Sequence, residues 1–132
     1  MNILLVDDSK AMRAMIRRAL QETGMCGLRV EEVANGSDAL ARLAQGLPDL
    51  ILSDWSMPEM TGIELLRELR ARGCDVRFGF ITCEMASPQM RETAFQAVSP
   101  CRIAMIRVAS MPPFSPRAWR AVKRFSCWRS GC

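Results

Sequence analysis

Short apolar runs recur along the chain and predict five strands. Residues 3–6 form an uninterrupted apolar run that predicts a buried strand, and residues 50–52 begin another. Residues 28–33 mix apolar with charged positions, which is typical of a strand at a sheet edge. Residues 77–82 predict a fourth strand and residues 103–108 a fifth.

Between the first two strands, apolar residues repeat at helical spacing. Ser9 is expected to be the N-cap of a helix over residues 11–20, and Gly24 follows its end. Its basic residues are expected on the face turned away from the core: Arg13, Arg17 and Arg18.

Three more helices are predicted between the later strands. Ser37 is expected to cap a short second helix, and residues 63–70 form an amphipathic third. Ser87 and Pro88 are expected to start a fourth that runs to about residue 98. Strands that alternate with helices indicate an α/β fold with a parallel sheet covered on both faces. A last helix is expected over residues 115–125.

Length and composition fit one domain of 132 residues in the cytoplasm. No run approaches the roughly 20 apolar residues that cross a bilayer, and the N-terminus lacks the pattern of a signal peptide. The six cysteines are scattered and the chain has no histidine, so a zinc site is not expected. Scattered thiols are typical of a reducing compartment.

Charge is distributed unevenly. Residues 1–92 hold all 14 acids and 11 of the 18 basic residues, whereas residues 93–132 hold 7 basic residues and no acid. Such a tail could bind nucleic acid through its arginines and tryptophans. A poorly ordered or amphipathic tail is the simpler interpretation, and nucleic acid is not the partner that we expect.

Acidic residues stand where two of the predicted buried strands end. Asp7 and Asp8 follow the first strand, and Asp54 follows the third. In a parallel sheet of strand order 2-1-3-4-5 these two strands are neighbours, and ligands bind beyond their carboxyl ends. Three clustered carboxylates repel one another unless a cation offsets the charge, and Mg²⁺ prefers such oxygen ligands. The pattern therefore predicts a magnesium site.

Three strings of the sequence together resemble one known family. "ILLVDDS", "PDLILSDWSMPEMTGIELLRELR" and "FITCE" are similar to the receiver domain of bacterial two-component response regulators, and most similar to its single-domain, chemotaxis-like members. The resemblance covers roughly residues 1–96. It implies a flavodoxin-like, doubly wound sheet of the order given above, for which a chemotaxis receiver of this kind is itself a standard example.

The resemblance also implies a role for each acidic residue. Asp54 corresponds to the phosphoacceptor, a carboxylate nucleophile that forms an aspartyl phosphate. Asp8 and Asp54 would bind Mg²⁺ together with the backbone carbonyl of Ser56, and Asp7 would contribute directly or through water. The metal would offset charge on the transferring phosphoryl group.

Further positions follow from the same resemblance. Thr82 would donate its hydroxyl to a phosphoryl oxygen and so act as a switch, while Ser56 and Glu84 stand where the family tunes the lifetime of the phosphoryl group. The expected partners are a histidine kinase or phosphotransfer protein and a downstream protein. Such a receiver is not a dedicated enzyme, although it catalyses its own phosphorylation and dephosphorylation.

The sequence departs from the family in its last third. The family has a lysine after the fifth strand, which by spacing falls near Ala104, or near Pro112 in a later alignment; the only lysines are Lys10 and Lys123. Residues 97–132 are thus either foreign sequence, joined near residue 97, or a divergent end of the receiver. The missing lysine leaves open an alternative function, a pseudo-receiver that binds partners without a working phosphate switch.

A phosphatase of the haloacid-dehalogenase type also uses an aspartate nucleophile. That class needs a second aspartate two residues after the first, and Ser56 occupies this position. The receiver interpretation is therefore preferred.

Overall fold

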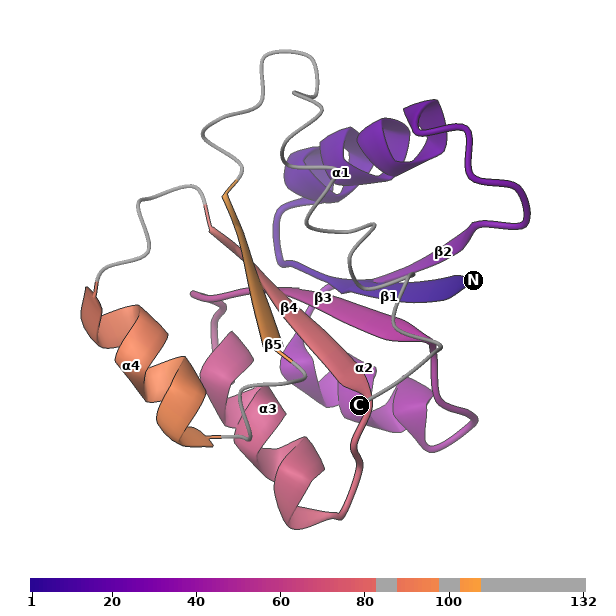
Figure 1. The fold of residues 1–132 in the computed structure, drawn as a ribbon. Coiled ribbons are helices and arrows are strands. Elements are labelled where there is room, and N and C mark those ends of the chain that lie inside the picture. The colour runs from indigo at the N-terminus through magenta and orange to yellow at the C-terminus, as the bar shows by residue number, and fades with distance from the viewer. Residues whose placement is uncertain (83–87, 98–102, 108–132) are drawn as a thin grey trace, which may run out of the picture.

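A five-stranded parallel sheet forms the centre of the computed structural model, which describes residues 1–82, 88–97 and 103–107 (Figure 1). The strands are β1 (Asn2–Val6), β2 (Arg29–Val33), β3 (Leu50–Asp54), β4 (Arg77–Thr82) and β5 (Ile103–Arg107). Across the sheet they lie in the order β2-β1-β3-β4-β5. The predicted α/β class and strand order are thus confirmed, and β2 is an edge strand as its charges indicated.

Among the described residues, four helices cover the two faces of this sheet. They are α1 (Lys10–Glu22), α2 (Gly36–Leu43), α3 (Gly62–Ala71) and α4 (Pro88–Ala97). Figure 1 shows α1 on one side of the sheet and α2, α3 and α4 on the other. The predicted helix over residues 115–125 and the predicted cap Ser87 lie outside the described residues. None of the helices that the structure describes is long and apolar enough to cross a membrane.

Apolar clusters hold the layers together on each face of the sheet. Because successive side chains of a strand point to opposite faces, Ile3 packs against α1 while Leu4 packs toward α2 and α3. On the α3 side, Phe78 and Phe80 are fully buried, with ring centroids 5.1 Å apart. Burial of a large apolar side chain stabilises a fold by roughly 1.5–3 kcal/mol. The acidic ends of the strands therefore extend from a tightly packed apolar core.

The helix starts differ in detail from the predictions. Ser9 caps α1 as expected, since its Oγ accepts from the N–H of Met12 at 3.3 Å. The cap of α2, however, is Asn35 and not Ser37: its Oδ1 accepts from the N–H of Asp38 at 2.7 Å. Asparagine caps a helix as well as serine does, and with Asn35 as the cap the helix begins at Gly36.

At the edge of the sheet, β2 carries two glutamates that point to opposite faces. Glu31 pairs with Arg42 of α2, and Glu32 pairs with Arg13 and Arg17 of α1. Because neighbouring residues of a strand alternate in direction, each glutamate ties the edge strand to the helix on its own side.

Candidate functional site

The register of the sheet brings the acids of two strands together. β1 and β3 pair in parallel, with Val6 opposite Ser53. The next residues are Asp7 and Asp54, so both acids stand at the carboxyl end of the sheet on adjacent strands. Asp54 is the last residue of β3 rather than the first of the loop, a one-residue difference from the prediction.

Asp7 is held firmly and is almost entirely buried, with 3% of its surface exposed. Its N–H donates to the carbonyl of Val33 at 3.2 Å, and its own carbonyl accepts from Nη1 of Arg13 at 2.5 Å. The carboxylate Oδ1 accepts from the N–H of Ser9 at 2.8 Å. Asp8, in contrast, is exposed.

Asp54 is half-buried, and the backbone that follows it orients its carboxylate. The N–H of Trp55 donates to Oδ1 of Asp54 at 2.7 Å. The indole of Trp55 packs on the ring of Phe80, with centroids 4.8 Å apart. The residue that carries the predicted chemistry is therefore anchored to β4 through its neighbour.

Burial is the main electrostatic influence on these acids. It raises the pKa of the Asp54 carboxyl, and the charges of Asp7 and Asp8 raise this pKa further, while N–H groups of Trp55 and Ser56 lower it. Burial likewise raises the pKa of Asp7 above the ordinary value of an aspartate; Asp8 adds to the rise, and the N–H of Ser9 and the charge of Arg13 oppose it. The three carboxylates thus lie within electrostatic range of one another.

These shifts predict how stability depends on pH without metal. A carboxyl whose pKa is raised by folding stabilises the fold below the pKa of the unfolded chain, near pH 4, and this contribution is lost as the pH rises through the folded value. Asp54→Asn removes one such group. In EDTA, the free energy of unfolding of the variant minus that of the parent should therefore increase from pH 4 to pH 7. Urea unfolding measures this difference. Asp7→Asn should give the same sign, and a difference independent of pH would contradict the assignment.

The loop after Asp54 is packed tightly against the strand it leaves. The N–H of Gly62 donates to the carbonyl of Trp55 at 3.0 Å. A Cβ on Gly62 would come within 2.2 Å of the backbone oxygen of Asp54, so only glycine fits there. Glu59 has a φ of 65°, a left-handed conformation that residues with a side chain rarely adopt.

A capping box closes this loop where α3 begins. The hydroxyl of Thr61 accepts from the N–H of Glu64, and the Glu64 carboxylate accepts from the N–H of Thr61 at 2.8 Å. The spacing of threonine and glutamate could have revealed this signal in the sequence. It fixes the point at which the chain turns from the acidic edge into the helix.

Of the remaining predicted residues, Thr82 and Ser56 lie at the same edge of the sheet as Asp54, because Ile81, just before Thr82, stands opposite Asp54. Thr82 ends β4 and pairs with Arg107 of β5. Ser56 is exposed in the loop after Asp54, and Glu84 lies outside the described residues. Ala104 lies inside β5, so the position after the fifth strand comes later than the first alignment assumed.

The donors suit Mg²⁺, although the present arrangement is not a closed site. Within residues 1–82, 88–97 and 103–107, no group of three or more acidic or cysteine side chains is close enough to hold a metal ion. Mg²⁺ commonly uses only one or two carboxylates and keeps several waters. Burial raises the pKa values of Asp7 and Asp54, and neighbouring carboxylates add to the rise; a cation would relieve this added repulsion.

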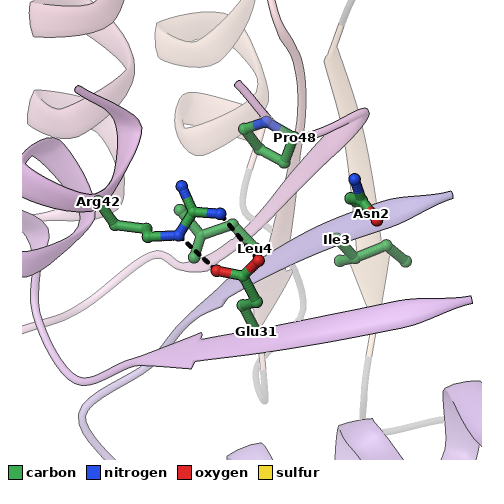
Figure 2. Close-up of a pocket in the computed structure, with 6 residues that line it drawn as sticks. All are labelled: Asn2, Ile3, Leu4, Glu31, Arg42 and Pro48. Atoms are coloured by element: carbon green, nitrogen blue, oxygen red, sulfur yellow. Dashed lines mark hydrogen bonds and ion pairs between the residues drawn. The ribbon is translucent and has the colours of Figure 1, made fainter. Parts of the chain in front are cut away.

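A small pocket lies elsewhere, between β1, β2 and α2 (Figure 2). Its lining residues are Asn2, Ile3, Leu4, Glu31, Arg42 and Pro48. Across the pocket, the guanidinium of Arg42 forms a bidentate ion pair with the carboxylate of Glu31, so these two charges already neutralise each other. The pocket includes the first residue of β1, whereas Asp7 follows the last residue of that strand, and it is therefore separate from the acids.

Comparison with curated proteins finds chemotaxis receivers. The chain is 44% identical over 71 residues to the chemotaxis protein CheY of Pseudomonas aeruginosa, which covers 54% of this chain and 56% of that protein. It is 39% identical over 71 residues to CheY-3 of Vibrio cholerae, covering 54% and 53%. The matched stretch thus spans about half the length of these relatives.

Solved structures and a family model agree with this likeness. CheY4 of Vibrio cholerae superimposes with a TM-score of 0.75 at 28% identity, over 94% of this chain and 97% of that one. TrrA from Thermotoga maritima, in complex with Mg²⁺ and BeF, gives 0.72 at 25% identity over 94% and 97%. The family model described as the response regulator receiver domain matches residues 3–99. The chain therefore belongs to the family of response regulator receiver domains.

Proposed function

We propose that this protein is the receiver of a phosphorelay, which accepts a phosphoryl group on Asp54 in a Mg²⁺-dependent step. One observation carries the proposal most strongly: the register of β1 and β3 places Asp7 and Asp54 on adjacent strands at the same edge of the sheet, and Asp8 follows Asp7. A half-buried aspartate surrounded by like charge is poorly stabilised as an anion by itself. The same arrangement suits a group that meets a divalent cation and then a phosphoryl group.

The proposed reaction is a phosphoryl transfer in line. A carboxylate oxygen of Asp54 forms the new bond to phosphorus, and the bond from phosphorus to the donor histidine nitrogen breaks, leaving its electron pair on the imidazole. The N–H of Trp55 holds Oδ1 and thereby orients the nucleophile. When bound, Mg²⁺ would supply charge compensation for the phosphoryl oxygens.

Each site residue has a proposed part in this step. Asp8, Asp54 and the backbone carbonyl of Ser56 would hold the metal, with Asp7 acting directly or through water. Thr82, at the end of β4, would provide the switch hydroxyl, and Ser56 and Glu84 would tune the lifetime of the product. The proposed donor is a histidine kinase or phosphotransfer protein, the output is contact with another protein, and the proposed location is the cytoplasm.

Acetyl phosphate, a small phosphoryl donor, tests this function directly. With Mg²⁺ the intact mass should increase by one phosphoryl group, and with EDTA in place of Mg²⁺ it should not, because the transferring charge is then uncompensated. Intact-mass spectrometry of the full chain measures both. An unchanged mass with Mg²⁺ would reject the proposal.

A pseudo-receiver is the second candidate, and the absence of a lysine between Lys10 and Lys123 favours it. In that case phosphorylation could occur without propagating a change. Amide hydrogen exchange of the phosphorylated chain separates the two functions: altered protection around β4 supports a working switch, whereas unchanged protection supports the pseudo-receiver.

We propose one receiver domain over residues 1–132, with residues 97–132 as its divergent part. Two origins of that part stay open, a join near residue 97 and divergence of a receiver. β5 pairs with β4 over residues 103–107, where the apolar pattern predicted a strand, and this pairing supports the second.

A further inference from the structure

The environment of Arg13 differs from that expected for a surface arginine of an amphipathic helix. Only 15% of its side chain is exposed, compared with 51% for Arg17 and 82% for Arg18. The sequence pattern predicts all three on the solvent face; for Arg13 this prediction is wrong. Its guanidinium reaches the backbone carbonyl of Asp7, just after the end of β1.

The guanidinium joins three elements at the acidic edge. Nη1 donates to the backbone carbonyl of Asp7 at 2.5 Å, and Nε donates to the Glu32 carboxylate of β2 at 3.3 Å. Arg17 contacts the other oxygen of Glu32 at 3.2 Å. A planar guanidinium can serve two acceptors at fixed angles, which an ammonium group on a flexible chain cannot.

We propose that Arg13, held by Glu32, is a positioning residue for the acidic pair: it fixes the backbone of Asp7 and so the turn that carries Asp7 and Asp8. The carbonyl of Asp7 is the link between the two acids, because the peptide bond that contains it leads to Asp8. The inference rests on the proposed function, since the pair is positioned for a divalent cation. Groups that orient metal ligands typically change metal affinity by an order of magnitude or more when removed.

Charge alone predicts the opposite result, which makes the proposal testable. A cation beside the acids repels Mg²⁺, so removal of its charge alone should tighten Mg²⁺ binding. If Arg13 instead positions the turn, Arg13→Met should weaken Mg²⁺ binding roughly tenfold. Arg13→Lys keeps the positive charge but loses the planar guanidinium that serves two acceptors, so it should also weaken Mg²⁺ binding.

The affinity of the full chain for Mg²⁺ alone is measured by isothermal titration calorimetry. Matched controls are Arg17→Met, which loses a contact to Glu32 but has no hydrogen bond to Asp7 among the described contacts, and Arg18→Met, whose partner is Glu22. Both should keep the parent's affinity within about twofold, since neither touches the turn. Hydrogen exchange in EDTA provides a readout without metal: the amide of Ser9, which donates to Asp7, should exchange faster in Arg13→Met.

The outcomes are distinct. Weaker Mg²⁺ binding in both Arg13 variants, with faster exchange at Ser9, supports the positioning role. Unchanged or tighter Mg²⁺ binding in Arg13→Met overturns the positioning role, while the proposed function stands. A lower urea midpoint in EDTA together with unchanged Mg²⁺ affinity also overturns the positioning role, because Arg13 then acts only on stability. A parent chain that neither binds Mg²⁺ nor accepts phosphoryl overturns the proposed function, and this inference with it.

Discussion

Asp54→Asn is expected to abolish the gain of phosphoryl mass from acetyl phosphate while leaving the fold intact. The amide has no anionic oxygen to attack phosphorus, so the loss should be complete. The substitution also removes a half-buried carboxyl whose pKa is raised by burial and by Asp7 and Asp8. Stability at neutral pH in EDTA should therefore not fall. Intact-mass spectrometry and urea unfolding measure the two results.

Asp38→Asn is the matched control for this substitution. Asp38 is an exposed aspartate in the first turn of α2, and it accepts a hydrogen bond from Asn35. This variant should still gain one phosphoryl group in Mg²⁺. If Asp54→Asn gained the same mass as the parent, another residue would be the acceptor and the proposed site would be wrong.

Gly62→Ala is expected to have the largest effect on stability among substitutions at this edge. A methyl group here would come within 2.2 Å of the backbone oxygen of Asp54 and 3.0 Å of Oγ of Ser53. Backbone cannot rotate away as a side chain can, so β3 or α3 must shift. We expect a loss of about 3 kcal/mol, in the upper part of the range for overpacking. Urea unfolding measures it, and slower phosphorylation should accompany it because the displaced residue is Asp54.

Gly36→Ala is a close control, because Gly36 also begins a helix with an ordinary φ. Its added methyl would meet Sδ of Met60 at 2.6 Å, and a methionine side chain can move. A loss of about 1 kcal/mol or less is expected. Equal losses of unfolding free energy in the two variants would contradict the claim that contact between residue 62 and the backbone of β3 causes the larger loss.

The sheet was predictable because a strand that is buried on both faces consists of consecutive apolar residues. Residues 3–6 are continuously apolar, and a strand of a parallel sheet covered on both sides needs that composition. The position of the acids followed from the same pattern, since Asp7 and Asp54 end such runs. Element boundaries were less accurate: Asp54 belongs to β3, and α3 begins at Gly62 rather than one residue later.

What the sequence could not predict depends on contacts between distant residues. Serine and asparagine are equally good helix caps, so nothing local distinguished Ser37 from Asn35. The position of Arg13 depends on Glu32, nineteen residues later, and on the carbonyl of Asp7, which no residue pattern reports. The predictions for Glu84 and for residues 115–125 lie outside the described residues and stay predictions.

The charges of β2 also bear on association between copies of this protein. An uncovered edge strand can recruit a strand from another chain and so begin aggregation, and proteins commonly counter this with charge and short length. β2 has five residues, and its two glutamates are engaged by three arginines, Arg13, Arg17 and Arg42. An incoming strand would have to lie beside these ion pairs, so this edge is protected against intermolecular pairing.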